Sequence, residues 1–155
     1  MVKKGEGYSL DGSVTGAFIK RRLENDRDVK CIITSKGSTT GLGKTMKAIL
    51  VCRWAQSLFH DEPWQADENG FLNIQKYVSR YKSCPQQSAL LIDEIEYGAD
   101  SRRSMSQDNV DLSHAWAQLR YRNCLTVATL PSVSMMDKRM MELADLWINV
   151  VQRGK

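Results

Sequence analysis

The segment between residues 29 and 59 constrains the fold of this chain more than any other. Val29–Thr34 is an apolar run of the kind that forms a buried strand, and an apolar helical pattern covers about residues 44–59. A loop rich in Gly, Ser and Thr separates the two. The order of strand, glycine-rich loop and helix predicts the first unit of an α/β fold.

The rest of the chain continues the alternation of strands and helices. We expect further strands at Ser88–Asp93, Cys124–Thr129 and Leu146–Val151, a short strand near Phe71-Leu72, and helices at Ile74–Lys82, from Ser106 to near Arg122, and at Ser134–Ala144. Strands that are apolar on both faces indicate a mainly parallel sheet covered by helices on both sides. Such sheets bind ligands at the carboxyl ends of their strands.

The chain has 155 residues, of which 42% are hydrophobic, enough for one domain with a substantial core. Residues 1–28 are rich in Gly, Lys and Asp, and we interpret them as a lead-in whose amphipathic stretch, Gly16–Leu23, forms a helix at the domain's edge. Residues 29–155 form the domain itself. The longest apolar run, Ala48–Cys52, is far shorter than the roughly 18 residues of a membrane span. We expect no transmembrane segment and a cytoplasmic protein.

The four cysteines and the net charge exclude little. Cys31, Cys52, Cys84 and Cys124 lack the close spacing of a zinc site or a redox pair, so we expect neither a metal site nor disulfides. Cys31 and Cys124 each open an apolar run and are interpreted as small hydrophobic residues in a reducing compartment. The four tryptophans lie in or beside core-type segments and are interpreted as packing residues. A net charge of +4, spread along the chain, allows a weak attraction to polyanions.

The loop after the first strand matches the phosphate-binding signature G-x-x-x-x-G-K-[ST], with a serine in place of the first glycine. We expect Lys44 to reach the β- and γ-phosphates of a nucleotide and Thr45 to place its hydroxyl on Mg²⁺. The backbone N–H groups of the loop would hold phosphate oxygens. The predicted cofactor-binding residues are Ser38, Thr39, Thr40, Gly41, Leu42, Gly43, Lys44 and Thr45.

A second motif follows the strand at 88–93. Asp93 ends that strand, where its carboxylate can serve the Mg²⁺ shell, so the predicted metal residues are Thr45 and Asp93. Glu94 is placed to act as the general base that polarises the attacking water, with Glu96 as a second candidate. Thr129 ends the next strand and is either a contact to the γ-phosphate or the lytic water, or a threonine satisfied in a turn.

These motifs together resemble the P-loop ATPases of the additional-strand, catalytic-glutamate class. The similarity covers about residues 29–150 and is strongest to the FtsK/HerA group of DNA motors and the zonula occludens toxin-like (Zot-like) ATPases of viruses and plasmids. It implies a RecA-like three-layer sandwich with sheet order 5-1-4-3-2. In FtsK/HerA proteins a glutamine that senses nucleotide usually follows the strand matching Leu125–Thr129. Leu130 stands there in this chain, which leaves Thr129 as the sensor candidate.

The resemblance also implies a partner arrangement. Related motors carry an arginine finger just before the third strand of the motif series, where this chain has Arg120 and Arg122. Such a finger acts across a subunit boundary, so a homo-oligomer, a hexameric ring by resemblance, is implied, with DNA as a candidate substrate. The predicted catalytic residues are therefore Glu94, Thr129, Arg120 and Arg122.

The function predicted from the sequence is a Mg²⁺-dependent ATPase that moves DNA or another substrate in translocation, packaging or export. A guanine-reading N-K-x-D motif is absent from the sequence, which favours ATP. Two alternatives stay open. A nucleotide or small-molecule kinase would share the loop and the sheet, with Arg102-Arg103 as part of a lid, and a non-catalytic nucleotide-binding switch would bind without turnover.

Overall fold

A parallel sheet of five strands forms the centre of the computed structural model, which describes residues 8–35, 43–94, 107–130 and 138–151. The strands lie in the order β2-β3-β4-β1-β5, and every neighbouring pair is parallel. This confirms the α/β class and the sheet order implied by the resemblance. The strands are β1 (Val29–Ser35), β2 (Gly70–Phe71), β3 (Ala89–Ile92), β4 (Leu125–Thr129) and β5 (Leu146–Val150).

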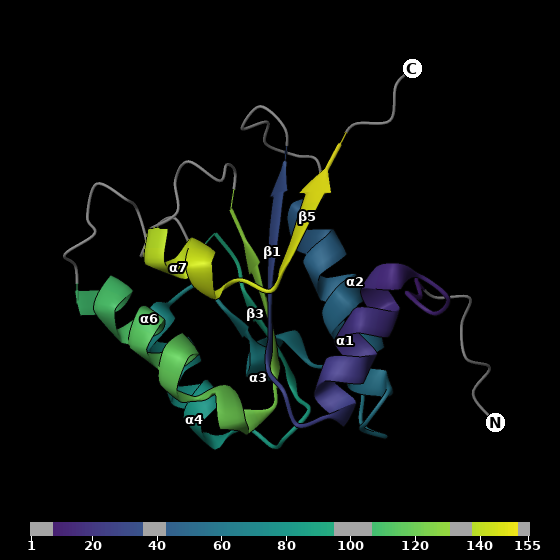
Figure 1. The fold of residues 1–155 in the computed structure, drawn as a ribbon, viewed down its shortest axis with the longest axis horizontal. Coiled ribbons are helices and arrows are strands. Elements are labelled where there is room, and N and C mark those ends of the chain that lie inside the picture. Colours follow the sequence, from purple (N-terminus) through teal and green to yellow (C-terminus); the bar gives the residue numbers. More distant parts are fainter. Residues whose placement is uncertain (1–7, 36–42, 95–106, 131–137, 152–155) are drawn as a thin grey trace.

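Helices cover both faces of the sheet (Figure 1). Their bounds are α1 (Val14–Glu24), α2 (Lys44–Ser57), α3 (Ala66–Asn69), α4 (Ile74–Ser83), α6 (Gln107–Gln118), the 3₁₀ turn η3 (Arg120–Arg122) and α7 (Lys138–Leu143). One core cluster packs α4, α6 and α7 against the sheet, and a second packs α1 and α2 against the other face. Side chains along β1 point alternately to the two faces of the sheet. Ile32 therefore packs in the first cluster, while Cys31 and Ile33 pack in the second. Such a three-layer arrangement explains why β1 is buried throughout.

Local signals explain where two of the helices begin. Ser13 caps α1 by accepting a hydrogen bond from the Gly16 amide at 3.0 Å, and Asn73 caps α4 by accepting one from Lys76 at 3.0 Å. Gly16 is required at its position because a Cβ there would lie 2.2 Å from the carbonyl oxygen of Leu10. The expected amphipathic helix at 16–23 is thus extended by its cap to Val14–Glu24.

Some elements differ from the sequence expectations. The helix predicted to run to Arg122 ends at Gln118, and η3 follows, because the chain turns through Asn123 in the left-handed region at φ 52°. The described part of the methionine-rich helix is Lys138–Leu143: residues 134–137 of its predicted span lie outside the described residues, and Ala144 follows the end of the helix. Trp147 is 40% exposed, unlike the other three tryptophans, which are buried, so the structure covers this predicted packing residue only in part. Trp147 lies on β5, which is an edge strand of the sheet.

A buried charged pair lies near the amino end of β1. The ammonium of Lys30, 2% exposed, donates to the Asp28 carboxylate and, at 2.8 Å, to the Tyr81 hydroxyl. Burial lowers the pKa of Lys30 and raises the pKa of Asp28, while their mutual attraction opposes both shifts. Two buried ionisable groups therefore lie near the amino end of β1, whereas the predicted phosphate loop follows its carboxyl end.

Within the described part of the chain, no helix is long and apolar enough to cross a membrane.

Candidate nucleotide site

The carboxyl ends of β1, β3 and β4 bring the predicted site residues together. β1 ends at Ser35 and leads to α2 through residues 36–42, while β3 leads directly into Asp93 and Glu94. Ile33 pairs with Thr129 and Ile92 pairs with Ala128, so the three strand ends lie at one edge of the sheet. This is the edge at which parallel sheets bind ligands.

Only the last part of the predicted phosphate loop belongs to the described structure. The predictions for Ser38, Thr39, Thr40, Gly41 and Leu42 lie outside the described residues.

Gly43 stands at the start of α2 in the left-handed region, with φ 78°. A Cβ at Gly43 would meet no atom within 4 Å, so glycine is favoured there by its backbone conformation and not by lack of space. Without a side chain at this cap, the N–H groups of the first turn are left to other acceptors, as phosphate binding requires.

Lys44 lies close to the end of β1. Its ammonium donates to the Ser35 hydroxyl at 3.1 Å, and Ser35 is 5% exposed. The contact holds the cation of the motif beside the point where the chain leaves the sheet. Sequence reasoning missed Ser35, because a serine that ends a strand has no signature apart from its position before the loop.

Asp93 connects the two halves of the site. Its carboxylate accepts hydrogen bonds from the Thr45 hydroxyl, at 2.9 and 3.1 Å to the two oxygens, and from the Thr129 hydroxyl at 2.5 Å. The backbone N–H of Asp93 donates to the Phe71 carbonyl at 2.9 Å and so fixes the position of the residue. Residues 48 and 36 positions away in the sequence thus meet at one carboxylate.

The Thr45 and Asp93 pair has the donor chemistry that Mg²⁺ prefers. Both supply hard oxygen atoms, and Thr45 is exposed, which leaves room for water and phosphate oxygens to complete an octahedral shell. The described residues contain no group of three His, Cys, Asp or Glu that would form an all-protein metal cage. One carboxylate and one hydroxyl fit the pattern in which the substrate's phosphates share the ion.

Glu94 has an unusual backbone conformation. It lies in the left-handed region at φ 55°, a conformation that non-glycine residues rarely adopt and that occurs often at functional sites. Its amide donates to the Thr129 hydroxyl at 2.9 Å, and its side chain is exposed. The turn therefore presents the carboxylate to solvent at the same edge as Thr45.

Thr129 lies beneath these groups and is 2% exposed. Its hydroxyl donates to Asp93 and accepts from the Glu94 amide, so both of its hydrogen-bonding directions are in use. Thr129 contacts both acidic residues of the candidate site, and its predicted role as a sensor stays a prediction.

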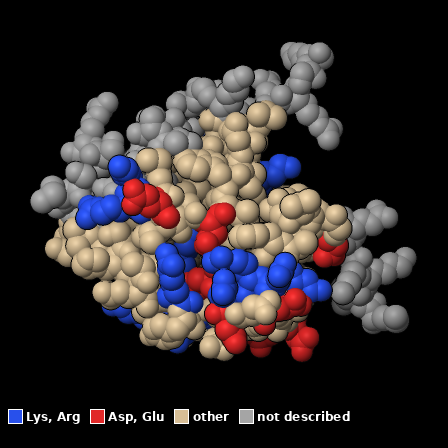
Figure 2. Space-filling model, in the orientation of Figure 1, with Lys and Arg blue, Asp and Glu red and all other residues tan. Residues whose placement is uncertain are grey.

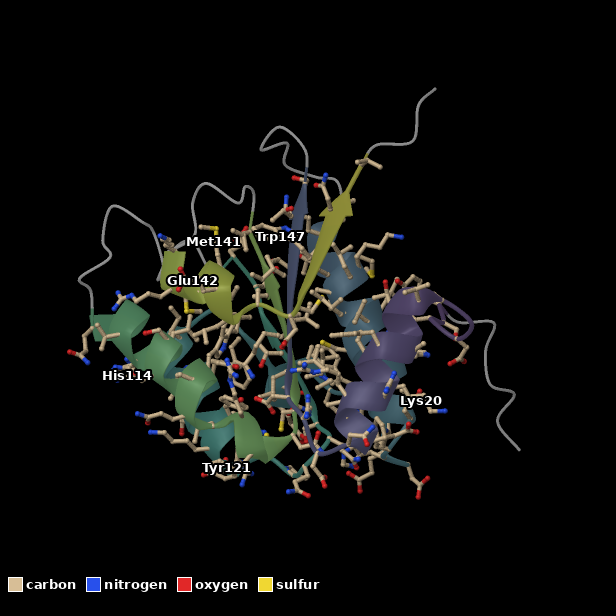
Figure 3. The ribbon with its side chains drawn as sticks, viewed as in Figure 1. Lys20, His114, Tyr121, Met141, Glu142 and Trp147 are labelled. Atoms are coloured by element: carbon tan, nitrogen blue, oxygen red, sulfur yellow. The ribbon has the colours of Figure 1, made fainter. Side chains whose placement is uncertain are left out.

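Arg120 and Arg122 lie near the amino ends of the strands, opposite the carboxyl ends that carry the candidate site. They form η3, which precedes the amino end of β4, whereas Thr129 ends that strand. Their neighbour Tyr121 lies far from the carboxyl end of β1 in Figure 3. Arg122 donates to the Cys84 carbonyl, while the side chain of Arg120 is exposed and borders a hollow of about 390 Å³. Basic and acidic side chains surround this part of the surface (Figure 2).

Glu96 and Arg102-Arg103 lie outside the described residues.

No protein-family profile matches the sequence, and a comparison with curated proteins gave no match. Solved structures do match. A chain of the E. coli MS115-1 HORMA:CdnC:Trip13 complex is 14% identical with a TM-score of 0.57, and the match covers 83% of this chain and 50% of that chain. This chain thus spans about half the length of that relative.

Two further similar structures are matched over most of their length. The genome packaging NTPase B204 from Sulfolobus turreted icosahedral virus 2 is 14% identical with a TM-score of 0.51, over 83% of this chain and 76% of that chain. The N-terminal domain of zonular occludens toxin from Neisseria meningitidis is 17% identical with a TM-score of 0.51, over 82% and 78%. These likenesses and the sheet order lead to one conclusion: the chain has the α/β, RecA-like fold of the P-loop NTPases.

Proposed function

We propose that this chain binds ATP with Mg²⁺ and hydrolyses it. The observation that carries the proposal is the meeting of Thr45, Asp93, Thr129 and the Glu94 amide at one sheet edge, next to Lys44. A chance combination of a glycine loop and an acidic strand end would not require these groups to touch.

Each residue has a distinct role in this proposal. Lys44 and the N–H groups at the start of α2 bind the phosphates, and Thr45 and Asp93 hold Mg²⁺, which would neutralise charge on the phosphate oxygens. Glu94 accepts the proton of the attacking water as general base. Thr129 positions Asp93 and Glu94, since its hydroxyl already serves both.

We further propose that the ATPase works as a homo-oligomeric motor, a hexameric ring, on DNA in translocation, packaging or export. Two of the similar structures, a genome packaging NTPase and a zonular occludens toxin domain, support this direction. The net charge of +4 and the exposed Arg120 are compatible with a polyanionic substrate and a finger acting in trans. Arg122 is the weaker finger candidate because it donates within its own chain.

Phosphate release and calorimetry with Mg²⁺-ATP test the ATPase proposal. We expect ATP to bind, GTP to bind much more weakly, and Lys44→Ala to abolish binding because it removes the cation of the loop. Lys47→Ala is the matched control, since Lys47 lies in the first turns of the same helix and contacts the Tyr8 ring, outside the motif. Equal ATP affinity of Lys44→Ala and the unmodified chain would show that the site is misassigned.

The DNA proposal is tested separately by adding double-stranded DNA to the same assay. We expect phosphate release to rise with DNA at low salt and the stimulation to weaken as salt increases. Transfer of phosphate to a small acceptor would instead indicate a kinase, and binding without turnover would indicate a nucleotide-binding switch.

A further inference from the structure

Two cysteines that are 40 residues apart in the sequence meet in the structure. Cys84 caps the C-terminal end of α4, and Cys124 directly precedes β4. Their Sγ atoms lie 3.3 Å apart, and both side chains are fully buried. A disulfide needs an S–S separation of about 2.05 Å, so an approach of roughly 1.2 Å would allow the bond.

The surroundings of the pair make its two sulfurs unequal. The two thiols share a hydrogen bond, and this contact, assisted by the nearby Arg122 guanidinium, lowers the pKa of Cys84 to about 7. The same hydrogen bond and burial raise the pKa of Cys124. The opposite directions of these shifts favour Cys84 as the nucleophile of the pair, because the thiolate is the reactive form of cysteine.

Residues that neighbour the two cysteines in the sequence are exposed. Pro85 and Gln86 follow Cys84 and are exposed, and Tyr121, in the turn before Cys124, is 67% exposed. Helix ends open locally at a smaller free-energy cost than the core of a domain. A small reagent can therefore reach the Cys84 sulfur when the last turn of α4 opens.

We propose that Cys84 and Cys124 form a reversible dithiol–disulfide site whose oxidant is hydrogen peroxide. The Cys84 thiolate attacks one peroxide oxygen, the O–O bond breaks, and hydroxide leaves, giving a sulfenic acid. Cys124 then loses its proton and attacks the Cys84 sulfur, forming the S–S bond and releasing the second oxygen as water. Two thiols are oxidised by two electrons, and one peroxide is reduced to two waters. This inference is independent of the proposed ATPase function.

The other two cysteines provide an internal comparison. Burial raises the pKa of Cys31 to about 12 and places the pKa of Cys52 well above its ordinary value, so neither forms a thiolate readily. Both lie in the second core cluster, Cys31 on β1 and Cys52 on α2. All four residues thus begin as free thiols with different expected reactivity.

The test is peptide mapping of the full chain after exposure to hydrogen peroxide, with free thiols blocked before digestion. We expect a mass loss of about 2 Da, a cross-linked peptide pair containing Cys84 and Cys124, and its disappearance after dithiothreitol. The oxidised protein should also unfold at a temperature higher by roughly 5 to 15 °C, because the bond closes a long loop of the unfolded chain.

Two variants keep the proposal open to contradiction. Cys52→Ala should retain the cross-link, whereas Cys124→Ala should lose it and accumulate sulfenic acid at Cys84. Four results would overturn the proposal: a Cys31–Cys52 cross-link, no cross-link at all, a bond that dithiothreitol does not break, or a lower unfolding temperature after oxidation. Mapping the unmodified chain decides the matter even if the Cys124 variant fails to fold.

Discussion

At the residue scale, the two threonines that contact Asp93 differ in what they can do. Thr45 is exposed, so a ligand can reach its hydroxyl, whereas Thr129 is 2% exposed and its hydroxyl is occupied by Asp93 and the Glu94 amide. A buried group with both hydrogen-bonding directions in use acts through its partners. Thr129 is therefore expected to set the geometry of the acidic pair.

Replacing Thr129 by valine tests this role. Valine keeps the shape but leaves the Glu94 amide without its acceptor, so we expect a loss of about 1–3 kcal/mol in unfolding free energy. We also expect kcat to fall while KM for ATP changes little, because binding depends on Lys44 and Thr45. Thr129→Ser retains the hydroxyl and should restore kcat. Denaturant unfolding and steady-state kinetics measure both effects, and an unchanged kcat in the valine variant would refute the positioning role.

A second residue-scale prediction concerns Glu94. Glu94→Gln preserves size and leaves Asp93 in place, so ATP should still bind, yet hydrolysis should fall by roughly 10²–10⁴ without the general base. Calorimetry and single-turnover hydrolysis separate the two properties. Glu142→Gln, an exposed residue of α7, is the matched control and should hydrolyse normally. Normal turnover in Glu94→Gln would show that another residue acts as the general base.

At the scale of elements, β1 contains a buried charged residue, Lys30, within a largely apolar run. Lys30 lies between buried strand residues, and its ammonium is held by Asp28 and Tyr81 and lies 4.8 Å from the centroid of the Tyr81 ring. A buried ion pair contributes little when complete, but removing one partner leaves an uncompensated charge. β1 therefore depends on α4, which supplies Tyr81, for more than apolar packing.

Lys30→Met should expose that dependence. The change leaves the Asp28 carboxylate without its cation, and we expect a loss of roughly 3–5 kcal/mol at pH 8. Burial already raises the pKa of Asp28, and removing Lys30 removes the main opposing influence. A group with a raised pKa in the folded state loses stability as pH rises through that pKa, so the deficit should shrink towards about pH 4. Urea unfolding across this range checks the sign, and a deficit independent of pH would contradict it.

The helix before the sheet allows a third stability prediction. Leu23 of α1 is fully buried in the second core cluster, so Leu23→Ala should cost about 2–5 kcal/mol and lower a single, shared unfolding transition. Lys20→Ala, on the exposed side of α1, removes only a surface ion pair with Glu24 and should change stability by less than about 1 kcal/mol. Thermal unfolding followed by circular dichroism compares them. If Leu23→Ala leaves the main transition unchanged, α1 folds separately from the sheet.

The elements that the sequence predicted well are those with strong local signals. The apolar runs of β1, β3 and β4 and the contrast between strand and helix periodicity give the layers, and the sheet order came with the family resemblance. The contact of Cys84 with Cys124 and the pairing of Lys30 with Tyr81 could not be predicted in this way. They depend on how α4 crosses the sheet, which spacing along the chain does not encode. The positive φ of Glu94, whose amide donates to Thr129, likewise has no signal in the sequence.

For the whole molecule, the decisive fact is that the candidate site and η3 lie at opposite edges of one sheet. Thr129 is the last residue of β4, whereas Arg122 precedes the start of that strand, so the length of β4 separates the two residues. Arg120 therefore cannot complete the site of its own chain. If an arginine contributes to hydrolysis from η3, a second copy must bring it to the first copy's carboxyl edge.

Mixing two inactive variants tests this arrangement. Glu94→Gln lacks the base but keeps Arg120, and Arg120→Ala lacks the finger but keeps Glu94, with an expected loss of about 10³–10⁵ for a finger supplied in trans. In a mixed oligomer, an Arg120→Ala subunit next to a Glu94→Gln subunit has its own base and receives the neighbour's arginine. The mixture should therefore recover part of the ATPase activity, and its dependence on mixing ratio should follow the fraction of such neighbours. Light scattering with Mg²⁺-ATP verifies that mixed oligomers form. If they form and the mixture stays as inactive as its components, Arg120 does not act between subunits.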